Sequence, residues 1–129
     1  MCPPVEYDPD VVAARDARDP ILTAELMRRF VGTYTWDSTD TTSLDLPLRS
    51  LAGLPPMVIE AAGHDLLVDD ARALAQRARG DGVEVVAYTE HPGQAHVFHI
   101  MAGLIGEANR AIDRFAKRLR TELDTHRIA

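Results

Sequence analysis

Residues 57–62 read Met-Val-Ile-Glu-Ala-Ala, and residues 83–88 read Val-Glu-Val-Val-Ala-Tyr. Each run is short and rich in aliphatic or β-branched residues, which favours a strand, and the first is apolar enough to predict a strand covered on both faces. Between them, small and apolar residues recur at helical spacing over 69–79, and Gly80-Asp81-Gly82 supplies a stop. A strand, a helix and a strand in this order predict a βαβ unit with two parallel strands.

Helices are predicted on both sides of this unit. Asp19-Pro20 is a helix-start signal, because Asp caps free N–H groups and Pro is tolerated at the first helical position. It predicts a helix near 20–32, with an apolar face made of Leu22, Leu26 and Phe30. A closing helix is predicted over about 106–123, and one face of it carries Ala108, Ala111, Ile112, Phe115, Leu119 and Leu123. Its basic residues lie toward the negative end of the helix dipole, and a solvated face is their simplest interpretation.

The whole chain of 129 residues is expected to form a single partial α/β domain. Residues 1–18 show no period and are expected to be irregular, although residues 2–5 could end a strand. A helix and a long polar loop follow over 19–56, the βαβ unit and closing helix over 57–123, and a tail over 124–129. Two complete strands are too few for a sheet buried on both faces, so the sequence is typical of the end of a larger α/β domain.

Composition narrows the class of protein. The net charge is -6, which disfavours a surface that tracks nucleic-acid phosphates. The single Cys2 cannot form an intramolecular disulfide, and no apolar run is long enough for a membrane span or signal peptide. We therefore expect a cytoplasmic protein without a membrane span or nucleic-acid partner, and neither a cofactor nor a metal is predicted.

Chemistry is expected where the two strands end, because ligands gather at the carboxyl ends of strands in open α/β sheets. The segment 62–70 follows the first strand and 91–98 follows the second. Adjacent parallel strands end side by side, so Asp65 from one segment and His96 from the other are predicted to meet. An Asp that orients a His serving as general base makes two thirds of a nucleophile–His–acid triad.

The chain resembles the C-terminal part of an α/β-hydrolase of the bacterial hormone-sensitive-lipase-like esterase group. The resemblance is carried by LPLRSLAGLPP at 46–56, AAGHDLLVDDA at 61–71, GVEV at 82–85 and the segment 88–98 that leads into the last helix. It runs across most of 1–123 and is weakest in the first eighteen residues. It implies that Asp65 is the triad acid, that His96 is the general base, and that the substrate is a small acyl ester.

The resemblance also shows what this chain lacks. The family's nucleophile stands on a Gly-Asp-Ser-Ala-Gly-like elbow and its oxyanion hole on a His-Gly-Gly-like loop, and neither motif occurs here. Ser38, Ser43 and Ser50 have no glycines at the elbow spacing. We therefore expect the chain alone to be inactive on esters.

Three positions depart from the family pattern. Leu66 and Val68 stand where Pro and Arg are common, and Val97 stands where Gly is common and puts a larger side chain beside the base.

Other interpretations stay open for these residues. Asp65 could instead cap the following helix, although Asp69 and Asp70 lie nearer to its predicted start. His64 and His91 are expected to be ordinary polar loop residues, and His99 one more residue of the following turn. His91, His96 and His99 with Asp65 could form a zinc site, but the spacing matches no compact metal motif.

Three function classes follow from these alternatives: the C-terminal portion of a carboxylic-ester hydrolase, an inactive binding or assembly module, and a metal-binding protein. The strand 83–88 is expected at a sheet edge, since no later strand follows it. In the resembled family this strand often forms a dimer contact, which predicts a homodimer through Val83–Tyr88.

Overall fold

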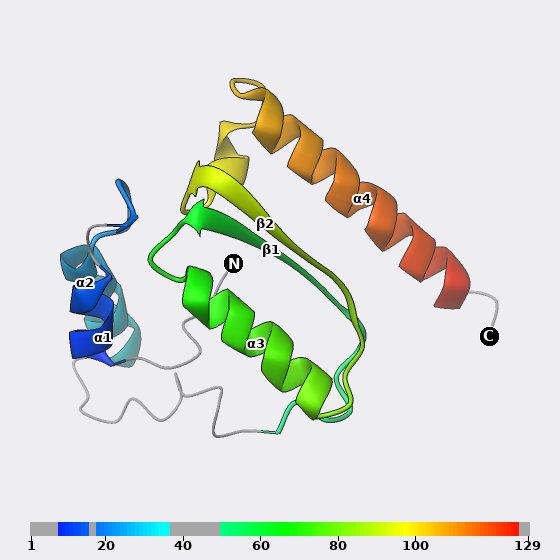
Figure 1. The fold of residues 1–129 in the computed structure, drawn as a ribbon, viewed down its shortest axis with the longest axis horizontal. Coiled ribbons are helices and arrows are strands. Elements are labelled where there is room, and N and C mark those ends of the chain that lie inside the picture. Colours follow the sequence, from blue (N-terminus) through cyan, green and yellow to red (C-terminus); the bar gives the residue numbers. More distant parts are fainter. Residues whose placement is uncertain (1–7, 16–17, 37–49, 127–129) are drawn as a thin grey trace. The chain divides into compact units, whose positions relative to one another are not determined.

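A computed structural model describes residues 8–15, 18–36 and 50–126, which fall into two compact units divided after His96 (Figure 1). The first unit contains helix α1 (Pro9–Ala14), helix α2 (Ala24–Thr35), strand β1 (Met57–His64), helix α3 (Val68–Gly80) and strand β2 (Val85–Ala95). The second contains the 3-10 helix η4 (Phe98–Met101) and helix α4 (Gly106–His126). The three predicted helices and two predicted strands thus occur in the predicted order, whereas α1 and η4 are additional elements.

The sheet of the first unit is a parallel pair that runs from Met57 opposite Val85 to His64 opposite Ala95, with shifts of register between Met57 and Val58 and between Ala62 and His64. The predicted α/β class with two parallel strands is therefore confirmed. Both strands are longer than predicted, and β2 continues through His91 to Ala95. Gly63 permits this extension, because a Cβ there would lie 3.1 Å from the His91 carbonyl oxygen and 3.1 Å from the Pro92 Cα.

Helix α3 packs on the sheet through small residues. Ala71, Ala75 and Ala78 are all buried, so the helix lies close to the strands. At its C-terminal end, Ala78 belongs to an apolar cluster with Leu51 and Val83. Burial of this surface stabilises the unit at about 25 cal/mol per Å² of apolar area removed from water.

The Asp81 carboxylate fixes the chain at the same end of α3. Its Oδ2 accepts hydrogen bonds from the Leu51 backbone N–H at 2.7 Å and from the Arg77 Nε at 3.0 Å. The Leu51 bond and then the Arg77 bond hold the pKa of Asp81 below its usual value. This segment is thereby tied to the helix before the chain enters β1.

A second apolar cluster joins α1 and α2 to the turn after β1, and its members are Val12, Leu22, Ala24, Met27, Val31, Leu66 and Leu67. Leu66 is completely buried in it. Outside the cluster, Arg15 Nη1 contacts Asp70 Oδ2 at 2.9 Å and Arg18 Nη1 contacts Asp69 Oδ2 at 2.6 Å. Apolar packing and ion pairs therefore anchor the turn that follows β1 to residues far away in the sequence.

The predicted start of α2 is wrong by four residues. The helix begins at Ala24, because Thr23 Oγ1 accepts the Leu26 N–H at 3.1 Å and so forms the N-cap. Asp19 caps a bend instead, with Oδ1 accepting from Ile21 N at 2.8 Å. The segment expected to be irregular contains α1, which Asp8 caps in a similar way.

Other boundaries differ less, and some predictions lie outside the described residues. Helix α3 starts one residue earlier and ends one residue later than predicted, and α4 continues to His126. The strand end suggested at 2–5 and most of the long polar loop fall outside the described ranges.

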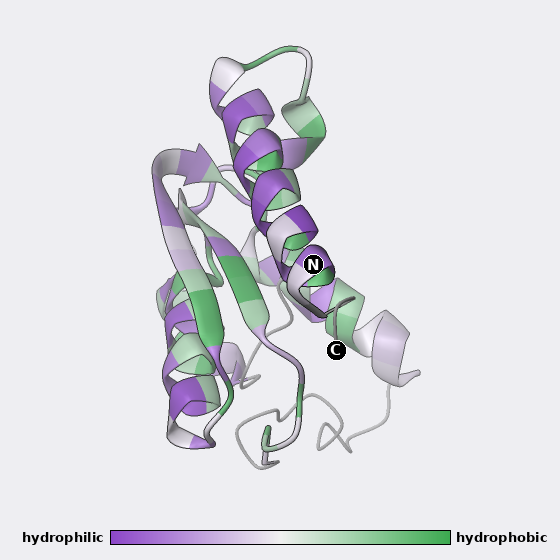
Figure 2. Cartoon of the chain, turned by 90° about the vertical axis from the view of Figure 1, so that its right-hand side faces the viewer, coloured by the Kyte–Doolittle hydropathy of each residue, from purple (hydrophilic) through white to green (hydrophobic). Residues whose placement is uncertain are grey.

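In the second unit, α4 shows the predicted amphipathic pattern, with hydrophobic and hydrophilic residues alternating along the helix (Figure 2). Ala108 and Ala111 are buried, whereas the side chains of Ile112, Phe115 and Leu119 are partly exposed. Across the described ranges, no helix combines the length and apolarity needed to cross a membrane.

Val97 opens the second unit in the left-handed region, with φ 47° and ψ 31°. A β-branched residue is strained there by roughly 1–2 kcal/mol, whereas glycine adopts this conformation freely. The backbone at position 97 therefore favours glycine, the residue that the resembled family commonly has there.

We predict that Val97→Gly raises the free energy of unfolding by about 0.5–1 kcal/mol, because relief of strain exceeds the extra backbone entropy that glycine loses on folding. Urea unfolding of both proteins measures the change. Val11→Gly is the matched control: Val11 is also exposed but lies within α1, so this substitution should lower the free energy of unfolding by about 0.5 kcal/mol. Equal destabilisation by the two substitutions would contradict the strain at Val97.

Candidate active site

Asp65 lies directly after β1, in the turn that leads into α3. Its side chain is buried, and Oδ1 accepts a hydrogen bond from the Leu67 backbone N–H at 2.8 Å. Asp65 thus also caps the turn that follows β1, but this role uses only one of its two carboxylate oxygens. Asp69 and Asp70 do not cap α3, because the helix begins at Val68 and both residues lie inside its first turn.

His96 follows the last residue of β2 and meets Asp65. Its ring Nδ1 lies 2.9 Å from Asp65 Oδ2, so the predicted hydrogen bond is present. The contact follows from the sheet, because His64 and Ala95, the residues immediately before the pair, are partners in the parallel register. In the neutral ring, a carboxylate partner places the proton on Nδ1 and leaves the lone pair on Nε2.

The electrostatics of this pair favour the protonated imidazole. The hydrogen bond that the His96 ring donates to Asp65 raises the pKa of His96 above its usual value, burial opposes this rise, and the negative charges of Asp65 and Asp19 add to it. This is the arrangement that a general base needs, because the imidazolium formed on proton uptake is stabilised in place.

Asp19 is a site residue that the sequence did not reveal. Its carboxylate is buried, and Oδ2 accepts hydrogen bonds from the backbone N–H groups of Leu66 and His96, each at 3.3 Å. The only signal in the sequence is Asp19-Pro20, a step that predicts a helix start. That motif describes local capping and contains no information on the partners of the second oxygen.

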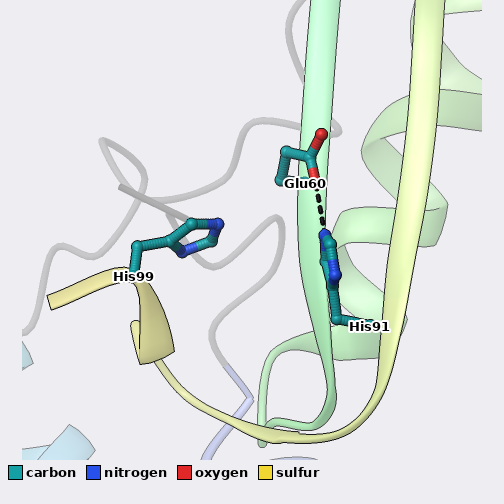
Figure 3. A group of neighbouring side chains, drawn as sticks. All are labelled: Glu60, His91 and His99. Carbon is teal, nitrogen blue, oxygen red and sulfur yellow. Dashed lines mark hydrogen bonds and ion pairs between the residues drawn. The ribbon is translucent and has the colours of Figure 1, made fainter. Parts of the chain in front are cut away.

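Glu60 and His91 form a second buried pair, which Figure 3 shows with Glu60 on β1 and His91 on β2. The Glu60 Oε2 and the His91 Nε2 are hydrogen bonded, and Glu60 Oε1 is buried without a hydrogen-bond partner among the described residues. The prediction that His91 is an ordinary polar loop residue is wrong. The strand continues past Tyr88, so His91 is an inward-facing strand residue only 3% exposed.

The zinc set suggested by the sequence is not assembled around His91 and His96. His91 pairs with Glu60, whereas His96 pairs with Asp65. Asp19, Asp65 and His96 do offer ligand atoms within 4.8 Å of one another. Both oxygens of each carboxylate already accept hydrogen bonds, however, which fits a hydrogen-bonded cluster better than a metal centre.

The remaining sequence candidates lie away from the Asp65–His96 contact. His64 ends β1 with an exposed side chain. Leu66 and Val68, two of the departures from the family pattern, are buried core residues. Ser50 is exposed, and its Oγ accepts the Ala52 N–H at 3.2 Å in a turn. Ser38 and Ser43 fall outside the described residues.

Comparison with known proteins places this geometry in a family. Residues 1–100 match the family described as alpha/beta hydrolase fold. An acetyl-hydrolase of Streptomyces hygroscopicus is 35% identical over 108 residues, which are 83% of this chain and 36% of that protein. A carboxylesterase/phospholipase of Mycobacterium tuberculosis is 34% identical over 71 residues, which are 54% of this chain and 18% of that protein.

A solved structure agrees with these relatives. An esterase from the bacterial hormone-sensitive lipase family superimposes with a TM-score of 0.75 at 30% identity, over 87% of this chain and 38% of that one. The chain therefore belongs to the α/β-hydrolase family. Within that family it is similar to the hormone-sensitive-lipase-like type, and it spans little more than a third of the length of the acetyl-hydrolase and of the esterase.

Proposed function

We propose that this chain is the part of a carboxylic-ester hydrolase that supplies the acid and the base of a Ser-His-Asp triad. The observation that carries the proposal is the hydrogen bond between Asp65 Oδ2 and His96 Nδ1 at 2.9 Å, at the ends of two adjacent parallel strands. The similarity to an acetyl-hydrolase and to esterases supports the reaction class and a small acyl ester as substrate.

In the proposed mechanism each group has one task. His96 Nε2 accepts the proton of an attacking serine hydroxyl and later returns it to the leaving alcohol. Asp65 holds the proton on Nδ1, fixes the ring plane and stabilises the imidazolium while the proton resides there. The serine and the oxyanion donors come from residues beyond these 129, since no elbow motif is present in the sequence.

The inactive binding or assembly module is the alternative. The same fold would support it, but the raised pKa of His96 and the bond at Nδ1 favour the hydrolase. A cytoplasmic location stays a prediction.

We predict that residues 1–129 alone do not hydrolyse p-nitrophenyl acetate or butyrate. A chimera in which these residues replace the corresponding third of the Streptomyces acetyl-hydrolase should hydrolyse both esters. Activity of the chimera should fall by about 10³-fold or more with His96→Ala or Asp65→Asn, because either change removes the base or its orientation. The assay is release of p-nitrophenol.

Two controls make this result specific. His64→Ala alters a neighbouring exposed histidine and should leave the chimera active. A folded chimera whose activity does not change with His96→Ala, or an isolated chain whose turnover is abolished by Ser38→Ala, Ser43→Ala or Ser50→Ala, would overturn the proposal.

We also propose self-association through the edge of β2 near Val83–Tyr88. Within the described residues β2 pairs with β1 alone. The unpaired backbone N–H and C=O groups of a β-branched edge strand can pair with a strand of another chain. Sedimentation should show a dimer that dissociates on dilution, and amide exchange at Val85 to Tyr88 should speed up as it does. A monomer over a wide concentration range would contradict this proposal.

A further inference from the structure

Two Asp-Pro steps in this chain begin with the same local geometry. At Asp8-Pro9, Oδ1 of Asp8 accepts hydrogen bonds from the N–H groups of Asp10 and Val11. At Asp19-Pro20, Oδ1 of Asp19 accepts from Ile21 at 2.8 Å and Leu22 at 3.0 Å. In both cases one carboxylate oxygen is sufficient for the turn that follows.

The second carboxylate oxygen distinguishes Asp19 from Asp8. Asp8 is exposed, whereas Asp19 is 5% exposed, and its Oδ2 reaches two backbone N–H groups distant in the sequence. One is Leu66, the residue after the candidate acid, and the other is His96, the candidate base itself, each at 3.3 Å. One carboxylate oxygen thus bridges the two segments that the triad pair comes from.

The Asp19 carboxylate is surrounded by hydrogen-bond donors. Its four acceptor bonds all come from backbone N–H groups, and hydrogen bonds of this kind stabilise a buried carboxylate. An oxygen of Asp19 also lies within 4.8 Å of a His96 ring nitrogen. The same side chain therefore sets the position of the backbone and adds negative charge beside the imidazole.

We propose that Asp19 is a positioning residue for the Asp65–His96 pair: its buried carboxylate bridges the backbones of both catalytic segments and holds them at hydrogen-bonding distance. The inference rests on the proposed function, because positioning Asp65 and His96 matters for catalysis. The hydrogen bonds of Asp19 themselves do not depend on the serine. Asp19 acts through its neighbours and does not touch the reacting atoms.

Asp19→Asn tests this proposal in the 129-residue chain by nuclear magnetic resonance. The amide retains one acceptor oxygen and places an NH₂ group against N–H donors, so one pair of hydrogen bonds is lost without a change in size. Amide exchange at Leu66 and His96 should accelerate by about tenfold or more, and the pKa of His96 should fall by about half a unit or more.

Asp8→Asn is the matched control, because it changes the same Asp-Pro cap in an exposed place. It should leave both the exchange rates at Leu66 and His96 and the pKa of His96 unchanged. If Asp19→Asn gives the same result as Asp8→Asn, Asp19 is a local cap only and the proposal is wrong.

A measurement on the unaltered chain covers the case in which Asp19→Asn does not fold. Scalar couplings across hydrogen bonds should join the side-chain carboxyl carbon of Asp19 to the amide nitrogens of Leu66 and His96 as well as to those of Ile21 and Leu22, because all four N–H groups donate to Asp19. Couplings to Ile21 and Leu22 alone would overturn the proposal. The proposed function is contradicted by a different result, an inactive chimera. Failure of the proposed function can therefore be told apart from failure of the proposed role of Asp19.

Discussion

The parallel pairing of β1 with β2 is the constraint on which the rest of this structure depends. It places His64 opposite Ala95, and the residue that follows each strand is a member of the candidate pair, Asp65 or His96. Their separation of 31 positions along the chain matters little once the two carboxyl ends share one edge. Helix α3 and the apolar cluster around Leu66 then hold the intervening turn in position.

The parts of the fold that could be predicted are those with a local or periodic signal. The apolar run from Met57 and the β-branched run from Val83 marked two strands, and the helical spacing between them marked α3. Their parallel arrangement then predicted the Asp65–His96 contact, because parallel strands end at the same edge.

The rest depended on contacts that no pattern encodes. His91 was misplaced because β2 continues through Pro92 and Gly93, residues that normally indicate a loop. Asp19 was assigned to a helix start, because a motif shows what one carboxylate oxygen does locally and not where the other one reaches. Both errors concern buried polar groups, whose partners are set by packing of distant segments.

The tautomer of the neutral His96 ring tests the central claim most directly, and nitrogen-15 resonance of the 129-residue chain measures it. At a pH above the His96 pKa, the account predicts the proton on Nδ1 and the lone pair on Nε2, with a pKa that falls in Asp65→Asn because the hydrogen bond and the negative charge of Asp65 are lost. A proton mainly on Nε2, together with a pKa that Asp65→Asn leaves unchanged, would contradict a triad base oriented by Asp65.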